Sequence, residues 1–243
     1  MYLWNSKVVL ITGASSGIGL ELSKELCRRG AKVIGLARSL DRLRRIEGLC
    51  KNFKGIKCDL INYEDIKEAI SKVRKYYGRI DVLINNAGGG LAKRLIEHTV
   101  SEFEYITKLN YISVFNLIHE ALPLILKSKE GVIVNVITAG VFVYLRRLPS
   151  YGAAKSALHY LSQILREELK EYGIRVICIY PGVVKTEFFR RAGMTQPKKG
   201  IEPKHVVRSI IKAIEDGKEN VFIPSYLRLL TALAKISPIR VFI

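Results

Sequence analysis

Tyr151 and Lys155 lie four residues apart, a spacing that places both side chains on one face of a helix. Delivery of a hydride to a carbonyl carbon builds negative charge on the carbonyl oxygen, and a phenol can supply the proton that neutralises it. A free phenol has a pKa of about 10, and a nearby ammonium group lowers that pKa. The pair is therefore predicted to perform acid–base chemistry on a carbonyl or an alcohol, with Tyr151 as the acid or base.

The same spacing occurs a second time, at Tyr63 and Lys67, so the spacing alone is not specific. Position separates the two copies. Tyr63 and Lys67 are interpreted as the solvated start of a helix. Tyr151 begins a helix that follows the fifth expected strand. This helix therefore starts beside the carboxyl edge of the sheet, where doubly wound folds bind ligands.

A glycine-rich segment joins the first expected strand to the first expected helix. Glycine permits a tight turn and close backbone approach, and a helix N-terminus offers free N–H groups and partial positive charge. The segment is therefore predicted to bind the pyrophosphate of a dinucleotide, although a merely tight turn is the alternative. The residues assigned to it are Gly13, Ser15, Ser16, Gly17, Ile18 and Gly19.

The second expected strand ends at Ala37 and is followed by Arg38. A site selective for NAD needs a carboxylate here to accept the ribose hydroxyls, and a carboxylate repels a 2′-phosphate. A guanidinium can instead hold that phosphate through two hydrogen bonds. Arg38 therefore favours NADP(H), the alternative being a solvated arginine on a loop.

Short runs rich in Val and Ile alternate with helical patterns along the chain, which is typical of a parallel sheet covered on both faces. The chain is expected to form one domain over residues 1–243, a three-layer, doubly wound parallel sheet of about seven strands. The expected strands are 7–12, 32–37, 54–58, 80–84, 131–137, 174–179 and 220–223, and the expected helices are 17–30, 39–48, 62–77, 99–127, 150–172 and 203–217.

The spacing TGxxxGxG at residues 12–19 resembles that of the short-chain dehydrogenase/reductase family, and the resemblance continues in family order to about residue 190. Asn85 to Gly88 resemble its NNAG motif, and Tyr151 to Lys155 its YxxxK motif. Pro181, Gly182 and Thr186 resemble its nicotinamide contact. The resemblance implies a Rossmann fold with strand order 3-2-1-4-5-6-7.

The resemblance also implies roles for individual residues. Lys155 would hold the nicotinamide ribose, and Asn110 would support a water chain to Lys155. Thr138 stands thirteen residues before Tyr151, where the family usually has serine; it keeps the hydroxyl and adds a methyl group that narrows the pocket. The catalytic set is thus Asn110, Thr138, Tyr151 and Lys155, and the further cofactor contacts are Asp59, Leu60, Asn86, Ala87, Gly88, Pro181, Gly182, Val184 and Thr186.

Two segments are expected to line the substrate pocket: the stretch between Thr138 and Tyr151, and a loop at about 187–202. Both are rich in apolar and aromatic residues, which favours a hydrophobic ketone, aldehyde or acyl chain over a free sugar. Nearby arginines could meet an anionic group or an acidic carrier protein, or face solvent. The pocket residues are Phe142, Tyr144, Phe188, Phe189 and Met194, and the arginines are Arg146, Arg147, Arg190 and Arg191.

The four cysteines include no CxxC pair, and no histidine lies at metal-ligand spacing from them. We therefore expect reduced thiols, with Cys27 and Cys178 buried as small hydrophobic residues, and no metal. The first residues show no secretory signal pattern, and no apolar run reaches the roughly 18 residues of a spanning helix. A cytoplasmic protein is the expectation.

The formal net charge is +18, which invites a nucleic-acid or membrane hypothesis. The cations are spread over many separate elements without interleaved aromatics, so no nucleic-acid partner is expected. The apolar and basic segment 225–243 falls outside the strand–helix alternation. It is expected to be a helix that packs on the domain or on another subunit, with an interfacial membrane anchor as the alternative.

Together these patterns predict an NADP(H)-dependent oxidoreductase acting on a fairly apolar carbonyl or alcohol. A 3-ketoacyl-carrier-protein reductase is the nearest alternative. A non-catalytic NADP(H)-binding sensor or scaffold is the alternative from another class, but the presence of both Tyr151 and Lys155 disfavours it. The family resemblance further implies a dimer or tetramer that pairs through the helices holding Asn110 and Tyr151.

Overall fold

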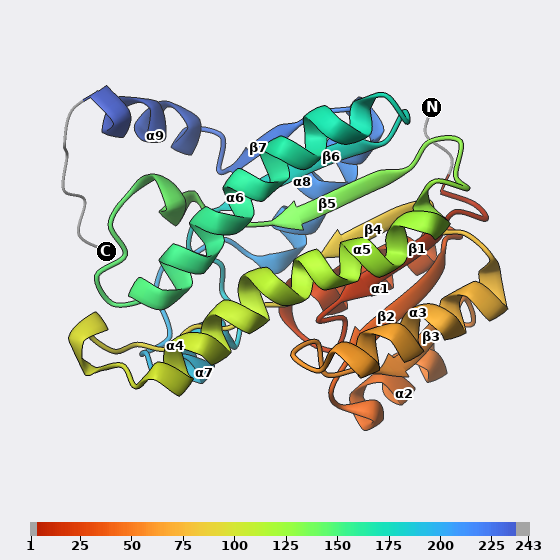
Figure 1. The fold of residues 1–243 in the computed structure, drawn as a ribbon, viewed down its shortest axis with the longest axis horizontal. Coiled ribbons are helices and arrows are strands. Elements are labelled where there is room, and N and C mark those ends of the chain that lie inside the picture. The colour runs from red at the N-terminus through yellow and green to blue at the C-terminus, as the bar shows by residue number, and fades with distance from the viewer. Residues whose placement is uncertain (1–3, 237–243) are drawn as a thin grey trace.

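The computed structural model, which describes residues 4–236, has seven parallel strands in the order β3-β2-β1-β4-β5-β6-β7 (Figure 1). This confirms the predicted sheet and its strand order. The strands β1 and β4 are neighbours near the middle of the sheet, and the direction in which the chain adds strands reverses between them. Such a reversal opens a crevice at the carboxyl ends of the strands. The strands are β1 (Val8–Thr12), β2 (Lys32–Ala37), β3 (Phe53–Lys57), β4 (Val82–Asn85), β5 (Val132–Val136), β6 (Arg175–Pro181) and β7 (Asn220–Ile223).

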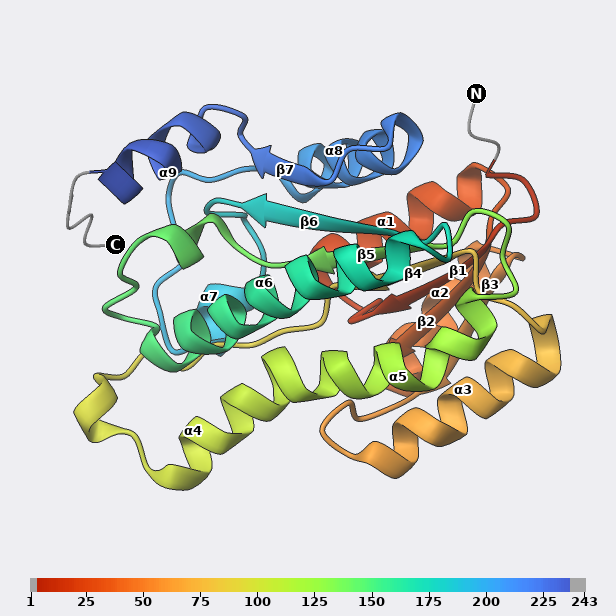
Figure 2. The same cartoon turned by 45° about the horizontal axis from the view of Figure 1, so that its top comes forward.

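Helices cover both faces of the sheet, which gives the predicted three layers (Figure 2). On one face α3, α5 and α6 bury residues such as Ile70, Leu117 and Leu158 against the strands. On the other face α1, α2 and α8 bury residues such as Leu22 and Ile210. The helices are α1 (Gly17–Arg28), α2 (Leu40–Leu49), α3 (Tyr63–Tyr77), α4 (Val100–Thr107), α5 (Ser113–Ile125), α6 (Pro149–Lys170), α7 (Phe188–Arg191), α8 (Pro203–Asp216) and α9 (Leu227–Ile236).

The helix expected over 99–127 has a π-helical turn, Lys108–Ile112, between α4 and α5. Its N-terminus has a capping box, because Thr99 accepts from the Glu102 N–H at 3.2 Å and Glu102 accepts from the Thr99 N–H at 2.8 Å. The π turn contains Asn110, whose side chain is completely buried. Such turns are rare and often occur at functional sites.

The expectation of four reduced cysteines is wrong, because Cys27 and Cys50 form a disulfide. Cys27 lies in the last turn of α1 and Cys50 directly follows α2, and both helices pack on the same face of the sheet. Their spacing of 23 residues matches no local motif, so only the docking of the two helices brings the sulfurs together. Cys58 and Cys178 are free and buried.

Reduction of this disulfide is expected to lower the stability of the fold by about 3 kcal/mol, because the bond limits the entropy of the unfolded chain. For a chain of this length, that corresponds to a fall in Tm of about 5–10 °C. The measurement is thermal unfolding with and without dithiothreitol. The double variant Cys27→Ser, Cys50→Ser should melt at the lower temperature and show no response to the reductant, and an unchanged wild-type Tm would contradict the prediction.

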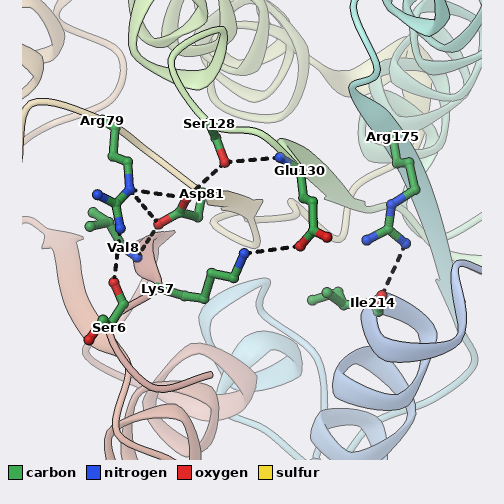
Figure 3. A network of polar contacts seen from close by, with 9 residues as sticks. All are labelled: Ser6, Lys7, Val8, Arg79, Asp81, Ser128, Glu130, Arg175 and Ile214. Atoms are coloured by element: carbon green, nitrogen blue, oxygen red, sulfur yellow. Dashed lines mark hydrogen bonds and ion pairs between the residues drawn. The ribbon is translucent and has the colours of Figure 1, made fainter. Parts of the chain in front are cut away.

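The amino-terminal edge of the sheet is held by a buried carboxylate, Asp81 (Figure 3). Asp81 accepts hydrogen bonds from the Val8 N–H at 2.7 Å, from the Ser128 hydroxyl at 2.7 Å and from the Arg79 guanidinium. These contacts join the starts of β1 and β4 to the segment before β5. A buried charge with several donors is a stabilising arrangement, and it lies at the opposite edge from the glycine-rich loop.

Candidate active site

The glycine-rich loop leaves the carboxyl end of β1 and enters α1 at Gly17. Gly13 and Gly17 have positive φ angles of 66° and 56°. A side-chain carbon at Gly19 would lie 2.2 Å from the Gly13 carbonyl oxygen, so only glycine fits there. The N-cap residue Ser16 makes no side-chain capping bond, so the first N–H groups of α1 are available to an anion.

Thr12 joins the glycine-rich loop to the loop that follows β4. Its hydroxyl accepts from the N–H groups of Asn86 (3.0 Å) and Ala87 (2.9 Å), and its carbonyl accepts from the Asn86 side chain at 3.0 Å. Gly13 also lies close to Ala87, because a side-chain carbon at Gly13 would be 3.0 Å from the Ala87 Cα. The predicted residues after β1 and β4 therefore form one continuous surface of the crevice.

Tyr151 and Lys155 project from the first turns of α6, with the lysine Nζ 5.9 Å from the centre of the phenol ring. Lys155 is buried, and its ammonium group donates to the Val136 carbonyl at 2.8 Å. Burial lowers the pKa of Lys155 to about 8. Burial also raises the pKa of Tyr151, and the hydroxyl of Thr138 acts in the opposite direction. The Lys155 ammonium was expected to lower the pKa of Tyr151, but desolvation has the larger effect and raises that pKa.

Thr138 follows β5 and lies beside Tyr151. Its hydroxyl oxygen accepts from the Gly140 N–H at 3.1 Å. The hydroxyl also hydrogen-bonds the Tyr151 phenol, and it makes a long contact of 3.4 Å to the Pro181 carbonyl. The proton can therefore be redirected towards an oxygen placed between Thr138 and Tyr151.

Asn110 binds the loop after β4. Its side chain accepts from the Gly89 N–H at 3.2 Å and donates to the Gly89 and Ile106 carbonyls at 2.8 and 2.9 Å. A side-chain carbon at Gly88 would lie 2.8 Å from the Asn110 oxygen and 3.7 Å from the Lys155 Nζ. Asn110 and Lys155 therefore contact the same glycine, from the π turn and from α6.

Three arginines lie around the outer end of the glycine loop. The Arg191 guanidinium is 3.4 Å from the Ser16 hydroxyl. Burial lowers the pKa of Arg191, and so do the nearby cations Arg42, Arg190 and Arg38, while Glu187 opposes them. Arg38 is exposed and reaches the Tyr105 hydroxyl at 3.4 Å. The like charges of these arginines repel one another, so the cluster is suited to binding an anion with more than one negative oxygen.

Sequence reasoning did not assign Arg42 or Arg191 to this cluster. Arg42 lies in the first turn of α2, four residues after Arg38, which precedes the helix, so closeness in the sequence could have suggested it. Arg191 comes from α7, more than 150 positions away in the sequence, and nothing local indicates that α7 folds over the loop.

The predicted pocket residues are distributed unevenly. Phe188 packs on the Tyr151 ring with centroids 5.1 Å apart, and Phe189 packs on Phe188 at 5.4 Å. Met194 is half-buried after α7, where its N–H bonds the Phe189 carbonyl at 2.8 Å. Tyr144 is largely exposed.

Phe142 differs from the expectation, because it packs with Tyr180 (5.3 Å), Phe222 (5.7 Å) and His159 (5.4 Å). It belongs to an aromatic cluster between α6 and the β6–β7 edge. Leu148, which sequence reasoning passed over, is closer to the pocket. A side-chain carbon at Gly90 would be 3.0 Å from both Leu148 and Phe188.

The segment after β6 covers the crevice from the other side. Val184 is buried and pairs with Ile201 in an isolated parallel bridge. Thr186 lies over Gly17, 3.2 Å from the place of a side-chain carbon there. Pro181 is buried, and Gly182 donates to the Ile223 carbonyl at 2.8 Å. Asp59 and Leu60 follow β3 at the same sheet edge, and Leu60 is buried.

No group of three or more His, Cys, Asp or Glu residues suited to a metal ion occurs within residues 4–236. The polar groups described at the carboxyl edge include hydroxyls, amides, backbone N–H groups, the Lys155 ammonium and several guanidiniums. This set fits a dinucleotide: glycines and a helix N-terminus for the diphosphate, and cations at the outer end.

The fold and this edge define a Rossmann-type nucleotide-binding oxidoreductase. The family model described as short chain dehydrogenase matches residues 7–197. The chain therefore belongs to the short-chain dehydrogenase family.

Known proteins similar to this chain agree with that assignment. It is 31% identical to an uncharacterized oxidoreductase of Staphylococcus saprophyticus over 216 residues, which cover 86% of this chain and 91% of the relative. A short-chain dehydrogenase from Sphingobium yanoikuyae in complex with NADPH has 28% identity and a TM-score of 0.86, covering 95% of this chain and 93% of that one. A short-chain dehydrogenase/reductase from Burkholderia phymatum in complex with NAD shares the fold at 18% identity, with a TM-score of 0.89 and coverage of 97% and 95%.

Proposed function

We propose that this protein transfers a hydride between NADP(H) and the carbonyl or alcohol group of a fairly apolar substrate, with Tyr151 as the acid or base. The observation that carries the proposal is the meeting of the Tyr151 phenol, the Thr138 hydroxyl and the Lys155 ammonium, with Gly88 of the loop after β4 next to the ammonium. When bound, the cofactor supplies or accepts the hydride. The side chains described below bind, orient and move protons.

Thr138 and Tyr151 provide two hydroxyl donors for the substrate oxygen. Thr138 is held by the Gly140 N–H, so its own proton can point to the carbonyl oxygen and polarise it. Tyr151 then donates its proton to that oxygen as negative charge develops. Its raised pKa keeps the phenol protonated at neutral pH, as reduction requires.

Lys155 and Asn110 complete the path of the proton. The Lys155 ammonium is fixed by the Val136 carbonyl, and it favours the negative charge that remains on Tyr151 after proton donation. Asn110 holds the loop of Gly88 and Gly89 against the ammonium group. We propose that water beside this loop returns the proton through Lys155 to Tyr151.

The preference for NADP(H) is supported by Arg38, Arg42 and Arg191. A 2′-phosphate carries about two negative charges, and guanidiniums bind phosphate oxygens through paired, charge-assisted hydrogen bonds. Ala37, at the end of β2, is not the carboxylate that an NAD site requires. The relative with 28% identity is described with NADPH, which agrees with this assignment.

The apolar character of the substrate is supported by the side chains around Tyr151. Phe188, Phe189 and Leu148 cover the phenol and the loop at Gly90 with carbon surface. Such a wall favours a hydrophobic group next to the reacting carbonyl. The direct test is NADPH oxidation over a panel of apolar ketones, aldehydes and a 3-ketoacyl thioester, with a free sugar as the polar comparison. Turnover confined to the sugar, or absent for every carbonyl, would contradict the proposal.

Removal of the Thr138 hydroxyl is expected to lower kcat. Thr138→Val keeps the branched shape but lacks the donor, so a fall of about 100-fold or more is expected, the usual effect of losing one such donor. Thr138→Ser keeps the hydroxyl and should remain within several-fold of the wild type. The measurement is steady-state kinetics at saturating NADPH, and equal activities of the two variants would show that the hydroxyl does not polarise the substrate.

Carbonyl reduction is expected to decline as the pH rises through about 8, the lowered pKa of Lys155. A lysine is cationic below its pKa, so burial causes the ammonium to be lost at a lower pH than the ordinary 10.5. The measurement is the pH profile of kcat/KM for reduction. Lys155→Arg retains its charge throughout this range, so whatever activity it keeps should lack the decline near pH 8.

A further inference from the structure

The helix α9 lies beside the proposed nicotinamide contact, at the carboxyl edge of the sheet (Figures 1 and 2). A side-chain carbon at Gly182 would be 3.1 Å from Leu227 Cδ1, so the first turn of α9 rests on this glycine. Thr231, one turn further on, is buried. The helix also contacts the short 3₁₀ turn Ala139–Phe142, which follows Thr138. The inner side of α9 is thus packed on the domain, while residues 237–243 of the segment 225–243 lie outside the described residues.

The outer side of α9 is apolar and uncovered. Leu229, Leu230 and Leu233 have exposed fractions of 66%, 53% and 47%, and Tyr226, just before the helix, has 62%. A soluble surface helix normally turns such residues inwards and charged residues outwards. Several large apolar side chains gathered on one exposed helix indicate a surface that binds a partner.

The loop at residues 143–147 follows the 3₁₀ turn that α9 contacts, and it carries more apolar and cationic groups. Tyr144 is 70% exposed, and Arg146 and Arg147 are exposed beside it. Arg228 adds an exposed cation on α9 itself. The segments 139–148 and 224–243 contain no Asp or Glu at all, whereas they contain Arg146, Arg147, Arg228, Lys235 and Arg240.

We propose that α9 and the loop at residues 143–147 dock together on an anionic lipid surface. An apolar helix face with cations around it is the pattern of helices that lie in the membrane interface, where leucines enter the acyl boundary and arginines meet lipid phosphates. No helix within residues 4–236 is long and apolar enough to cross a bilayer, so the contact is with the surface of the membrane.

Charge favours a lipid surface over a second copy of the chain. Symmetric pairing through this face would bring the same cationic, acid-free segments of two copies against each other. Their repulsion would oppose the burial of the leucines. An anionic bilayer instead attracts each Lys or Arg near its surface.

Docking in this way would place the substrate opening near the bilayer, because Leu227 lies on Gly182 and the 3₁₀ turn follows Thr138. Delivery of an apolar substrate from the lipid rests on the function proposed above. Membrane docking does not rest on that function, and it is measured without turnover.

The test is cosedimentation of the full chain with vesicles of phosphatidylcholine alone or mixed with phosphatidylglycerol. We expect binding to the anionic vesicles that weakens as NaCl is raised, and little binding to the neutral ones. Leu229→Glu with Leu233→Glu should lower the partition coefficient about tenfold or more, because two leucines no longer enter the acyl boundary. Arg146→Gln with Arg147→Gln should weaken only the charge-dependent part.

The matched control is Leu49→Glu with Tyr76→Glu, which makes the same kind of change at exposed sites on α2 and α3, away from α9. It should bind anionic vesicles nearly as well as the wild type. Thermal unfolding and size-exclusion chromatography of all variants report folding and self-association. Equal vesicle binding by the α9 variant and the control would overturn the proposal, as would a wild type that ignores anionic vesicles. A change of oligomeric state in the α9 variant without a change in vesicle binding would assign the face to a second copy instead.

Discussion

Replacing Tyr151 with Phe is expected to lower kcat for carbonyl reduction by about 10³-fold, within the range that general acid catalysis contributes. The ring of Phe preserves the packing on Phe188, where the centroids are 5.1 Å apart. Only the hydroxyl that donates the proton is lost. Cofactor binding should change little, and Tm should stay close to that of the wild type. The measurement is steady-state NADPH oxidation with the best carbonyl substrate found.

The second YxxxK copy provides the control for this experiment. Tyr63 is the first residue of α3, and its hydroxyl donates to Glu120 of α5, away from the glycine loop. Tyr63→Phe is therefore expected to leave kcat unchanged. Turnover by Tyr151→Phe equal to that of Tyr63→Phe would remove Tyr151 from the mechanism and return the non-catalytic sensor to consideration.

Replacing Arg38 with Asp is expected to shift the ratio of kcat/KM for NADPH over NADH by about 10²–10⁴ towards NADH. The change removes a charge-assisted contact with the 2′-phosphate and adds a repelling carboxylate, each effect being of the order of 1.5–3 kcal/mol. The new carboxylate can also accept hydrogen bonds from the ribose hydroxyls of NAD, as in NAD-selective sites. Binding of both nucleotides by calorimetry should show the same reversal in the absence of substrate.

Arg45→Asp is the matched control, because Arg45 is an exposed arginine on α2 and the substitution changes the net charge equally. It should leave the cofactor ratio near that of the wild type. Arg191→Gln should weaken NADPH more than NADH, since Arg191 lies 3.4 Å from Ser16 and close to Arg38 and Arg42. A cofactor ratio unaffected by Arg38→Asp would show that the guanidinium cluster does not recognise the 2′-phosphate.

Much of the fold could be predicted because each strand and helix has a local cause. The strands β2 (Lys32–Ala37) and β7 (Asn220–Ile223) have the boundaries expected from their apolar runs. The helix expected over 99–127 was harder, since its helical pattern continues through the π turn at Lys108–Ile112. The π turn inserts one extra residue into the helix, and the residue types within it are not different from those of an ordinary helix, so no local signal marks it.

The candidate site divides in the same way. The glycine loop, Tyr151 and Lys155 were predicted from residue type, short spacings and position after the first and fifth strands, and Thr138 from the family resemblance. Other features depend on segments that are distant in the sequence. The packing of Phe142 with Tyr180 and Phe222 and the approach of Arg191 to Ser16 are of this kind.

By itself the sequence determined the parallel sheet and predicted the nucleotide loop and the acid–base pair, because strand hydrophobicity, glycine conformation and helical spacing are local properties. Only the tertiary structure decided that Cys27 bonds to Cys50, that burial lowers the pKa of Lys155, and that α9 leaves its leucines exposed. Each of these depends on how separate elements pack, which fixes the distances between distant residues and the water around each group.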